Sequence, residues 1–201
     1  MSQDARRNHP PQPHGRGRTW RQTASGLWLP SGAWHSNLML RSWGAIVGNL
    51  LRTGGRSYRL STMYLEYENT AAPGDVVTPP AYGRDPADGL AYYNALADST
   101  DRDYLRVPVF HDELGVSDSE LYPDGNIVHM WAQTTGISGV HGKPFSSAAN
   151  SRVFGAASVA TPNAVDATAD LICNRLYFDA ADQVDKPDSG QVAVEIEIQF
   201  D

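Results

Sequence analysis

The sequence predicts a mainly β protein: an antiparallel β-sandwich of the jelly-roll-like kind, with one N-terminal helix and an extended N-terminal arm. Several segments alternate apolar and polar side chains with a period of two, as strands with one buried face do. Stretches rich in glycine, proline and aspartate separate these segments and are typical of turns. Hydrophobic residues make up 41% of the 201 residues and charged residues 19%, which is enough apolar material for a core.

Residues 1–35 are predicted to form the arm, because they show no hydrophobic periodicity and are rich in proline and glycine. The segment also holds three tryptophans and several arginines. An indole is costly to leave in water, so we expect these rings to fill pockets on a neighbouring subunit. The predicted interface anchors of the arm are Trp20, Trp28, Trp34, Arg16, Arg18 and Arg21.

Charge is divided unevenly along the chain. Residues 1–22 carry five arginines and one aspartate, a net charge of +4, and since the whole chain carries −7 the remainder carries −11. A basic segment favours contact with a negative partner, either nucleic acid or the acidic flank of a neighbouring copy. The acidic body should repel nucleic acid, so we expect no direct nucleic-acid binding. The preference for arginine, with only two lysines, indicates forked interface contacts or, equally, a GC-rich genome.

Residues 36–201 are predicted to form one domain that opens with a helix over residues 36–53. Apolar residues recur in that helix at steps of three and four. Ser36 or Asn37 can cap its start, and the glycine pair that follows Thr53 can end it in a left-handed turn.

Strands are predicted over residues 57–68, 104–110, 127–133, 152–160, 170–178 and 192–200. In the first of these, Met63, Leu65 and Tyr67 face one way and Glu66 faces the other. Pro108 in the second strand indicates a strand end or a sheet edge. The last strand alternates branched apolar residues with alanine, glutamate and glutamine, which predicts one face in a core and one wet, acidic face.

Residues 70–103 are predicted to form a long insertion, because four prolines prevent regular pairing through most of it. A short helix is predicted over residues 87–97. A loop of this length is usually functional or packed on a partner. Tyrosine together with arginine is typical of interface hot spots, and ordinary β packing is the equal alternative. The predicted interface residues of the insertion are Tyr82, Tyr92, Tyr93 and Arg84.

The sequence contains no pattern that indicates catalysis. The His-Glu-x-x-His, Gly-x-Ser-x-Gly and phosphate-loop motifs do not occur. His111 precedes two acidic residues, but neighbours on a strand face opposite sides, and the acidic loop that follows lacks the spacing of a calcium site. His129, in the middle of a predicted strand, is interpreted as a satisfied histidine. We therefore predict a non-enzyme with no catalytic residues, no metal site, no cofactor and no small-molecule ligand.

Cys173 is the only cysteine, so an intramolecular disulfide is excluded and a buried, inert thiol is predicted. The sequence has no apolar run of the roughly 20 residues that span a bilayer, and its polar start does not have the composition of a signal peptide. We expect no membrane partner, and a protein made in the cytoplasm or used in a particle assembled there.

A pattern of spaced blocks covers roughly residues 37–201. The block 37–54 places an apolar pair after an asparagine and continues into the predicted helix, with bulkier residues at 41–43 before Gly44. Blocks at 63–69 and 102–108 follow, then a small-residue strand at 155–160 and a closing strand that ends in Glu-Ile-Gln-Phe. This pattern resembles small virion structural proteins of tailed phages. The opening glycine common in those proteins is replaced here by bulkier residues.

The resemblance implies a structural role in a virion, with a β-sandwich body. We predict a subunit of the tail or head–tail region that contacts copies of itself and other virion proteins, and that anchors tail parts or fibres. One alternative is a capsid decoration, or cement, protein. Another is a glycan-binding receptor-recognition module, for which Trp131 and Tyr122 are the candidate residues.

Overall fold

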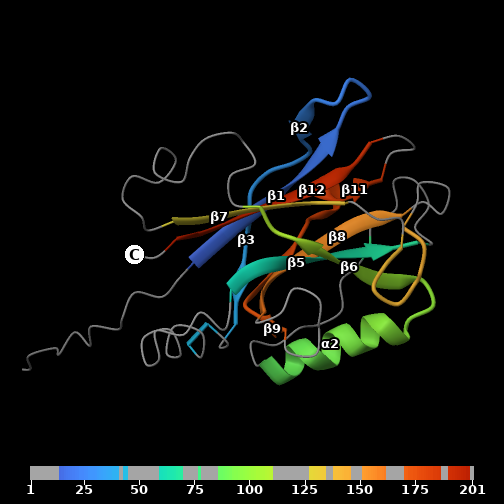
Figure 1. Ribbon diagram of the computed structural model, residues 1–201. Coiled ribbons are helices and arrows are strands. Elements are labelled where there is room, and N and C mark those ends of the chain that lie inside the picture. Colours follow the sequence, from blue (N-terminus) through green and yellow to red (C-terminus); the bar gives the residue numbers. More distant parts are fainter. Residues whose placement is uncertain are drawn as a thin grey trace, which may run out of the picture.

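The computed structural model describes residues 14–40, 43–44, 59–69, 77, 86–110, 127–134, 138–145, 151–161, 170–186 and 190–199. Within these residues the protein is mainly β: two antiparallel sheets, with helix α2 (Pro86–Asp98) lying along one of them (Figure 1).

The first sheet has the strand order β2-β1-β12-β7, and β3 also pairs with β1. β1 pairs with β12 along its whole length, from His14 opposite Gln199 to Arg21 opposite Val192. The first and last described strands are therefore neighbours. The bounds are β1 His14–Gln22, β2 Trp28–Pro30, β3 His35–Ser36, β7 Ile127–Gln133 and β12 Val192–Gln199.

The second sheet has the order β4-β10-β8-β5-β6, and β9 and β11 also pair with β8. Every residue of β8 is buried, because both of its faces are covered. The bounds are β4 Leu38–Met39, β5 Arg59–Glu68, β6 Arg102–Pro108, β8 Arg152–Thr161, β9 Leu171–Ile172, β10 Asn174–Tyr177 and β11 Val184–Asp185.

Two apolar cores hold these layers together. The first lies between the two sheets, where Met63 and Leu65 of β5 join Met130 of β7 and Ile196 of β12 in one buried cluster. The second lies between α2 and the opposite face of the second sheet, and its members include Leu96 of the helix, with tyrosines from α2, β5 and β6. The order of layers is sheet, sheet, helix, as Figure 1 shows.

Most of the predicted elements are present in the described residues. Each predicted strand is found, although the segment 170–178 is divided into β9 and β10 at Cys173. Pro108 ends β6, as predicted. The helix predicted over residues 87–97 is α2.

The predicted helix over residues 36–53 is wrong at its start. Ser36 belongs to β3, and β4 pairs with β10 through Met39 opposite Asn174. These ladder hydrogen bonds override the local apolar periodicity. Trp43 and Gly44 are helical, and the rest of the predicted helix lies outside the described residues.

The predicted extended arm over residues 1–35 is also wrong where the chain is described. From His14 onward these residues belong to the first sheet as β1, β2 and the start of β3, while residues 1–13 lie outside the described part. The inward side of β1 is built from small residues. A Cβ on Gly17 would lie 2.5 Å from Leu176 Cδ2 and 2.6 Å from the Glu195 carbonyl oxygen, so only glycine lets β1 approach so closely.

Candidate functional site

The outer face of the first sheet, turned away from the second sheet, holds a row of large side chains. Arg18 of β1 stands opposite Glu195 of β12, and Glu195 stands opposite Trp131 of β7. Phe110 pairs with Trp131 in an isolated antiparallel bridge. Opposite residues of antiparallel strands share a face, so the row Arg18, Glu195, Trp131 and Phe110 crosses the sheet.

Three indoles pack together on this face. The Trp20 and Trp28 ring centroids lie 5.4 Å and 5.2 Å from that of Trp131, at interplanar angles of 61° and 88°. Such edge-to-face contacts add to the stability gained by burying the rings. Ala193 stands opposite Trp20 in β12, and its small side chain leaves room for the rings. Trp20 and Trp28, which were predicted to fill pockets of another subunit, pack partly on their own sheet, and both rings are half-buried.

Two arginines extend the indole cluster across β1. Arg18 Cζ lies 4.4 Å from the Trp20 ring centroid and 4.5 Å from that of Trp34, and Arg16 Cζ lies 4.4 Å from that of Trp34. These are cation–π distances. The rings and guanidinium groups adjoin one another, and we call this surface the indole–arginine strip. Its members are Phe110, Trp28, Trp131, Trp20, Arg18, Trp34 and Arg16.

Glu195 is the acidic centre of the strip. Its carboxylate accepts hydrogen bonds from Arg18 Nε at 2.7 Å, Trp20 Nε1 at 2.8 Å and His129 Nε2 at 2.8 Å. Burial raises the pKa of Glu195, but these hydrogen bonds and the charge of Arg18 lower it by more. The pKa of Glu195 therefore lies below its ordinary value. The predicted wet, acidic face of this strand is therefore wrong at Glu195, which is buried. His129 is buried beside it and contacts the Glu195 carboxylate through Nε2.

The remaining predicted anchors lie at the margins of the strip. Arg16 donates from Nε to Glu197 at 2.7 Å, and its side chain is 56% exposed. Arg21 is exposed, and it lies on the face of β1 opposite to that of Arg16, Arg18 and Trp20. Trp34 is half-buried. Both of its neighbours in the chain contact the Asp182 carboxylate, which accepts a hydrogen bond from Ala33 N at 3.3 Å and lies 2.6 Å from His35 Nε2.

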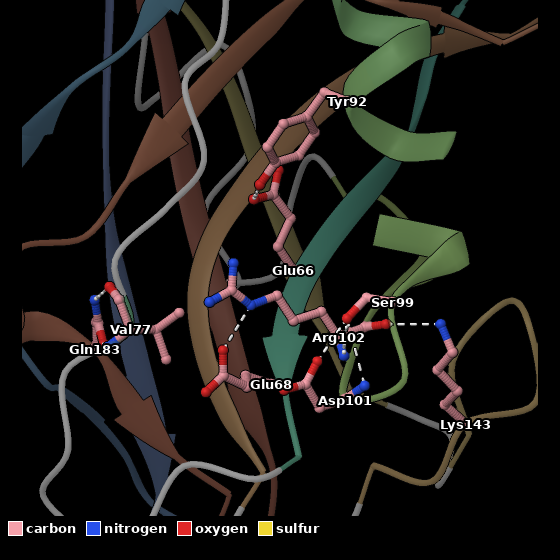
Figure 2. A network of polar contacts seen from close by, with 9 residues as sticks. All are labelled: Glu66, Glu68, Val77, Tyr92, Ser99, Asp101, Arg102, Lys143 and Gln183. Carbon is pink, nitrogen blue, oxygen red and sulfur yellow. Dashed lines mark hydrogen bonds and ion pairs between the residues drawn. The ribbon is translucent and has the colours of Figure 1, made fainter. Parts of the chain in front are cut away.

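A second cluster lies between α2 and the second sheet, around the fully buried Glu66. The Glu66 carboxylate accepts from Arg175 Nε at 2.7 Å, Arg175 Nη2 at 2.5 Å, Tyr92 OH at 2.8 Å and Tyr93 OH at 2.7 Å. Figure 2 shows the Tyr92 hydroxyl pointing from α2 at this carboxylate. A Cβ on Gly155 would lie 2.7 Å from Glu66 Oε2, so the glycine makes room for the charged group.

Arg175 is stacked as well as paired. Its Cζ lies 3.4 Å from the Tyr92 ring centroid and 3.9 Å from that of Tyr177. Burial lowers the pKa of Arg175, but the charge of Glu66 and its hydrogen bonds raise it above the ordinary value, so the guanidinium stays charged. The buried ion pair and the two phenols attach α2 to the sheet.

The predicted interface of the insertion is accordingly wrong for Tyr92 and Tyr93, which face their own sheet. Tyr82 and Arg84 lie outside the described residues. The end of α2 is attached as well, because Lys143 Nζ donates to the carbonyl oxygens of Leu96, Ala97 and Arg102. Figure 2 shows Lys143 beside Arg102. A cation at a helix C-terminus satisfies carbonyl groups that the helix leaves free.

One histidine–aspartate pair has part of the geometry of a catalytic site. His141 Nδ1 lies 2.9 Å from Oδ1 of the fully buried Asp103, the arrangement that orients a histidine base. Its other ring contact among the described residues is with Tyr104, and none of those residues places a serine, threonine or cysteine on the imidazole.

Burial raises the pKa of the Cys173 thiol to about 12, which leaves it protonated and unreactive.

The described residues contain no group of three or more histidine, cysteine, aspartate or glutamate side chains arranged to hold a metal ion. No described helix is long and apolar enough to cross a membrane.

Sequence reasoning missed the most deeply buried charges. Glu66 and Arg175 were not singled out, and Glu195 was placed on a wet face. One signal was available for Glu66. Tyr64 is two residues away on the same strand face, and a large aromatic side chain there indicates that another element packs on that face and buries Glu66. For Glu195 we find no comparable signal in β12 itself.

Comparison with known proteins adds no relative to these observations. No protein-family model matches the sequence, and neither a curated protein nor a solved structure matches it.

Proposed function

We propose that this protein is a non-enzymatic structural subunit of a tailed-phage particle, placed in the tail or head–tail region, where it anchors tail parts or fibres. Its partners are copies of itself and other virion proteins, and its location is the virion. The block pattern of the sequence supports this proposal, as does the mainly β body. The observation that carries it is the indole–arginine strip on an outer sheet face.

The strip has the composition of a protein interface. Tryptophan, phenylalanine and arginine are enriched at interfaces relative to the rest of a protein surface. Three of its indoles are half-buried, and Phe110 beside Trp131 is 40% exposed. Such a ridge of rings favours a protein partner that completes the burial. The strip is less suited to nucleic acid, because Glu195 and Glu197 neutralise its arginines.

The buried ion pair supports the same role. An assembly of many copies needs subunits that hold one shape, and a buried, hydrogen-bonded ion pair favours one packing over others. Glu66 and Arg175 do this between α2 and its sheet. As a finer description of the fold we propose a jelly-roll-like sandwich. The pairing of β1 with β12, which returns the chain to the sheet where it began, supports that description.

The glycan-binding alternative loses one of its candidate residues. Trp131 is 1% exposed and covered by two other indoles, so its ring has no free face on which a sugar could stack. Tyr122 lies outside the described residues. The capsid decoration alternative differs from the proposed function chiefly in copy number.

Quantitative mass spectrometry of purified particles tests the proposed function. Particles encoded by the genome that carries this chain are expected to contain it in tens of copies. Hundreds of copies would instead indicate a decoration protein of the capsid shell. Absence of the chain from washed particles would overturn the virion role altogether.

A further inference from the structure

We propose that the indole–arginine strip receives the proline-rich leader of a neighbouring copy, residues 7–13, so that subunits join head to tail. This inference rests on the proposed function and names the partner of its surface. It also reverses the roles expected from the sequence: the tryptophans form the receiving surface, and the proline segment before them is the part that docks.

The leader has the sequence of a polyproline ligand. It reads Arg-Asn-His-Pro-Pro-Gln-Pro over residues 7–13, directly before β1, and it lies outside the described residues. A polyproline II helix has three residues per turn and a rise of about 3.1 Å, so Arg7, Pro10 and Pro13 would share one side at intervals of about 9 Å. Segments with this proline spacing bind to aromatic surfaces, because the helix loses little entropy on binding.

The receiving side offers rings in several orientations. Trp20 and Trp28 stand edge-to-face on Trp131, and Phe110 continues the surface beyond β7. Pro30 of β2 stands opposite Trp20 and is exposed. Proline rings gain most from packing on such half-buried aromatic groups, since both partners lose water-exposed apolar area.

The direction of β1 favours docking on another copy. β1 runs from His14, beside Gln199, toward Trp20, which is six residues or roughly 20 Å further along the strand. The leader therefore joins the sheet at the end away from the three indoles. Seven residues of polyproline II helix are also about 20 Å long, which is enough to lie along the strip of a subunit stacked at that end.

Charge does not prevent this contact. Arg16 pairs with Glu197 and Arg18 pairs with Glu195, each at 2.7 Å, so the basic leader meets a strip whose arginines are neutralised. The contact then depends on packing of apolar rings, and salt should weaken it little.

The test uses the full chain with three sets of substitutions. The leader variant carries Arg7→Ala, Pro10→Ala and Pro13→Ala, and the strip variant carries Phe110→Ser. Val140→Ser is the matched control, because Val140 is 41% exposed but lies beside β6 in the other sheet, where its N–H donates to the Tyr104 carbonyl. Self-association is measured by sedimentation velocity over a range of protein concentrations.

The wild type and the control variant are expected to associate equally, and the leader and strip variants at least about tenfold more weakly. An equimolar mixture of the leader variant and the strip variant should form one-to-one pairs. Each pair uses the intact leader of one chain and the intact strip of the other, and no larger species should form.

Other outcomes overturn distinct claims. A leader variant that associates like the wild type, beside a weakened strip variant, refutes the leader as partner and leaves the assembly surface standing. A strip variant that associates like the wild type refutes the strip as the assembly surface, and with it the observation that carries the proposed function. A wild type that stays monomeric refutes the docking between copies.

A second measurement avoids any change to the strip. A synthetic peptide of residues 5–13 is titrated into the full-length leader variant, and tryptophan emission is followed. A saturable blue shift is expected, since the peptide excludes water from the half-buried indoles. The same peptide with both Pro10→Ala and Pro13→Ala should give no shift, and an equal shift from both peptides contradicts recognition of the prolines.

Discussion

Glu66 and Arg175 form an ion pair whose two side chains are both fully excluded from water, with Arg175 Nε 2.7 Å from Glu66 Oε1. On the helix side, the hydroxyls of Tyr92 and Tyr93 donate hydrogen bonds to the Glu66 carboxylate. On the sheet side, Gly155 lies against the same carboxylate. A charge in such a place is stable only while every partner remains.

The substitution Glu66→Gln should therefore be strongly destabilising. It leaves the Arg175 guanidinium buried beside a neutral amide, and breaking a buried pair in this way costs about 3–5 kcal/mol of unfolding free energy. Urea denaturation followed by circular dichroism measures the loss. Glu197→Gln is the matched control, because Glu197 pairs with the exposed Arg16 and such pairs contribute about 1 kcal/mol or less. Equal losses in the two variants would contradict the importance assigned to the buried pair.

Acid should loosen the indole–arginine strip through Glu195. Its folded pKa lies below the ordinary value of 4.5, so the stability it contributes is complete above that value and is lost as the pH falls through the folded pKa. The melting temperature of the wild type is expected to fall between about pH 5 and about pH 3 more steeply than that of Glu195→Gln. A variant with the same pH profile as the wild type would show that Glu195 contributes nothing to acid sensitivity.

Buried tyrosines should resist ionisation at alkaline pH. Burial raises the pKa of Tyr104 to about 12 and raises those of Tyr64, Tyr67 and Tyr92 from their ordinary value of 10 in the same direction. Because the folded pKa exceeds the unfolded one, the stability these groups contribute is present below about pH 10 and is lost as the pH rises through the folded pKa.

An ultraviolet titration of phenolate absorbance checks this prediction. The native protein is expected to show a deficit of ionised tyrosines near pH 11, followed by a steep rise when the chain unfolds. In denaturant, tyrosines should titrate together near pH 10. A native curve that coincides with the denatured one would mean that these hydroxyls are open to solvent.

Gly17→Ala should displace β1 from the second sheet. The added methyl group would meet Leu176 and the Glu195 carbonyl oxygen, and overpacking of this kind costs about 1–3 kcal/mol. Gly44→Ala is the control, because a Cβ at Gly44 would meet no atom of the described residues within 4 Å. Thermal denaturation is expected to show a lower midpoint for Gly17→Ala and an unchanged or slightly higher one for Gly44→Ala. A normal midpoint for Gly17→Ala would contradict the close approach described here.

The sequence predicts the strands well, because a period of two is visible wherever one strand face is apolar. It fails for β1, whose inward residues are Gly15, Gly17 and Thr19: their smallness suits a close approach but gives no hydrophobic signal. It also fails for the faces that carry Glu66 and Glu195. A strand pattern shows which residues share a face, but the cover that buries that face comes from α2 or from the indoles of β1 and β2, far away in the sequence.

The neighbouring positions of β1 and β12 have a consequence for the order of folding. The strip takes Trp20 from the start of the described chain and depends on Glu195 from its end, and pairing across so long a separation forms late and slowly. During synthesis, a ribosome-bound chain that lacks β12 also lacks the Glu195 carboxylate that holds Arg18 and Trp20 in place. The surface that we propose as the docking site is therefore complete only after β12 has joined the sheet.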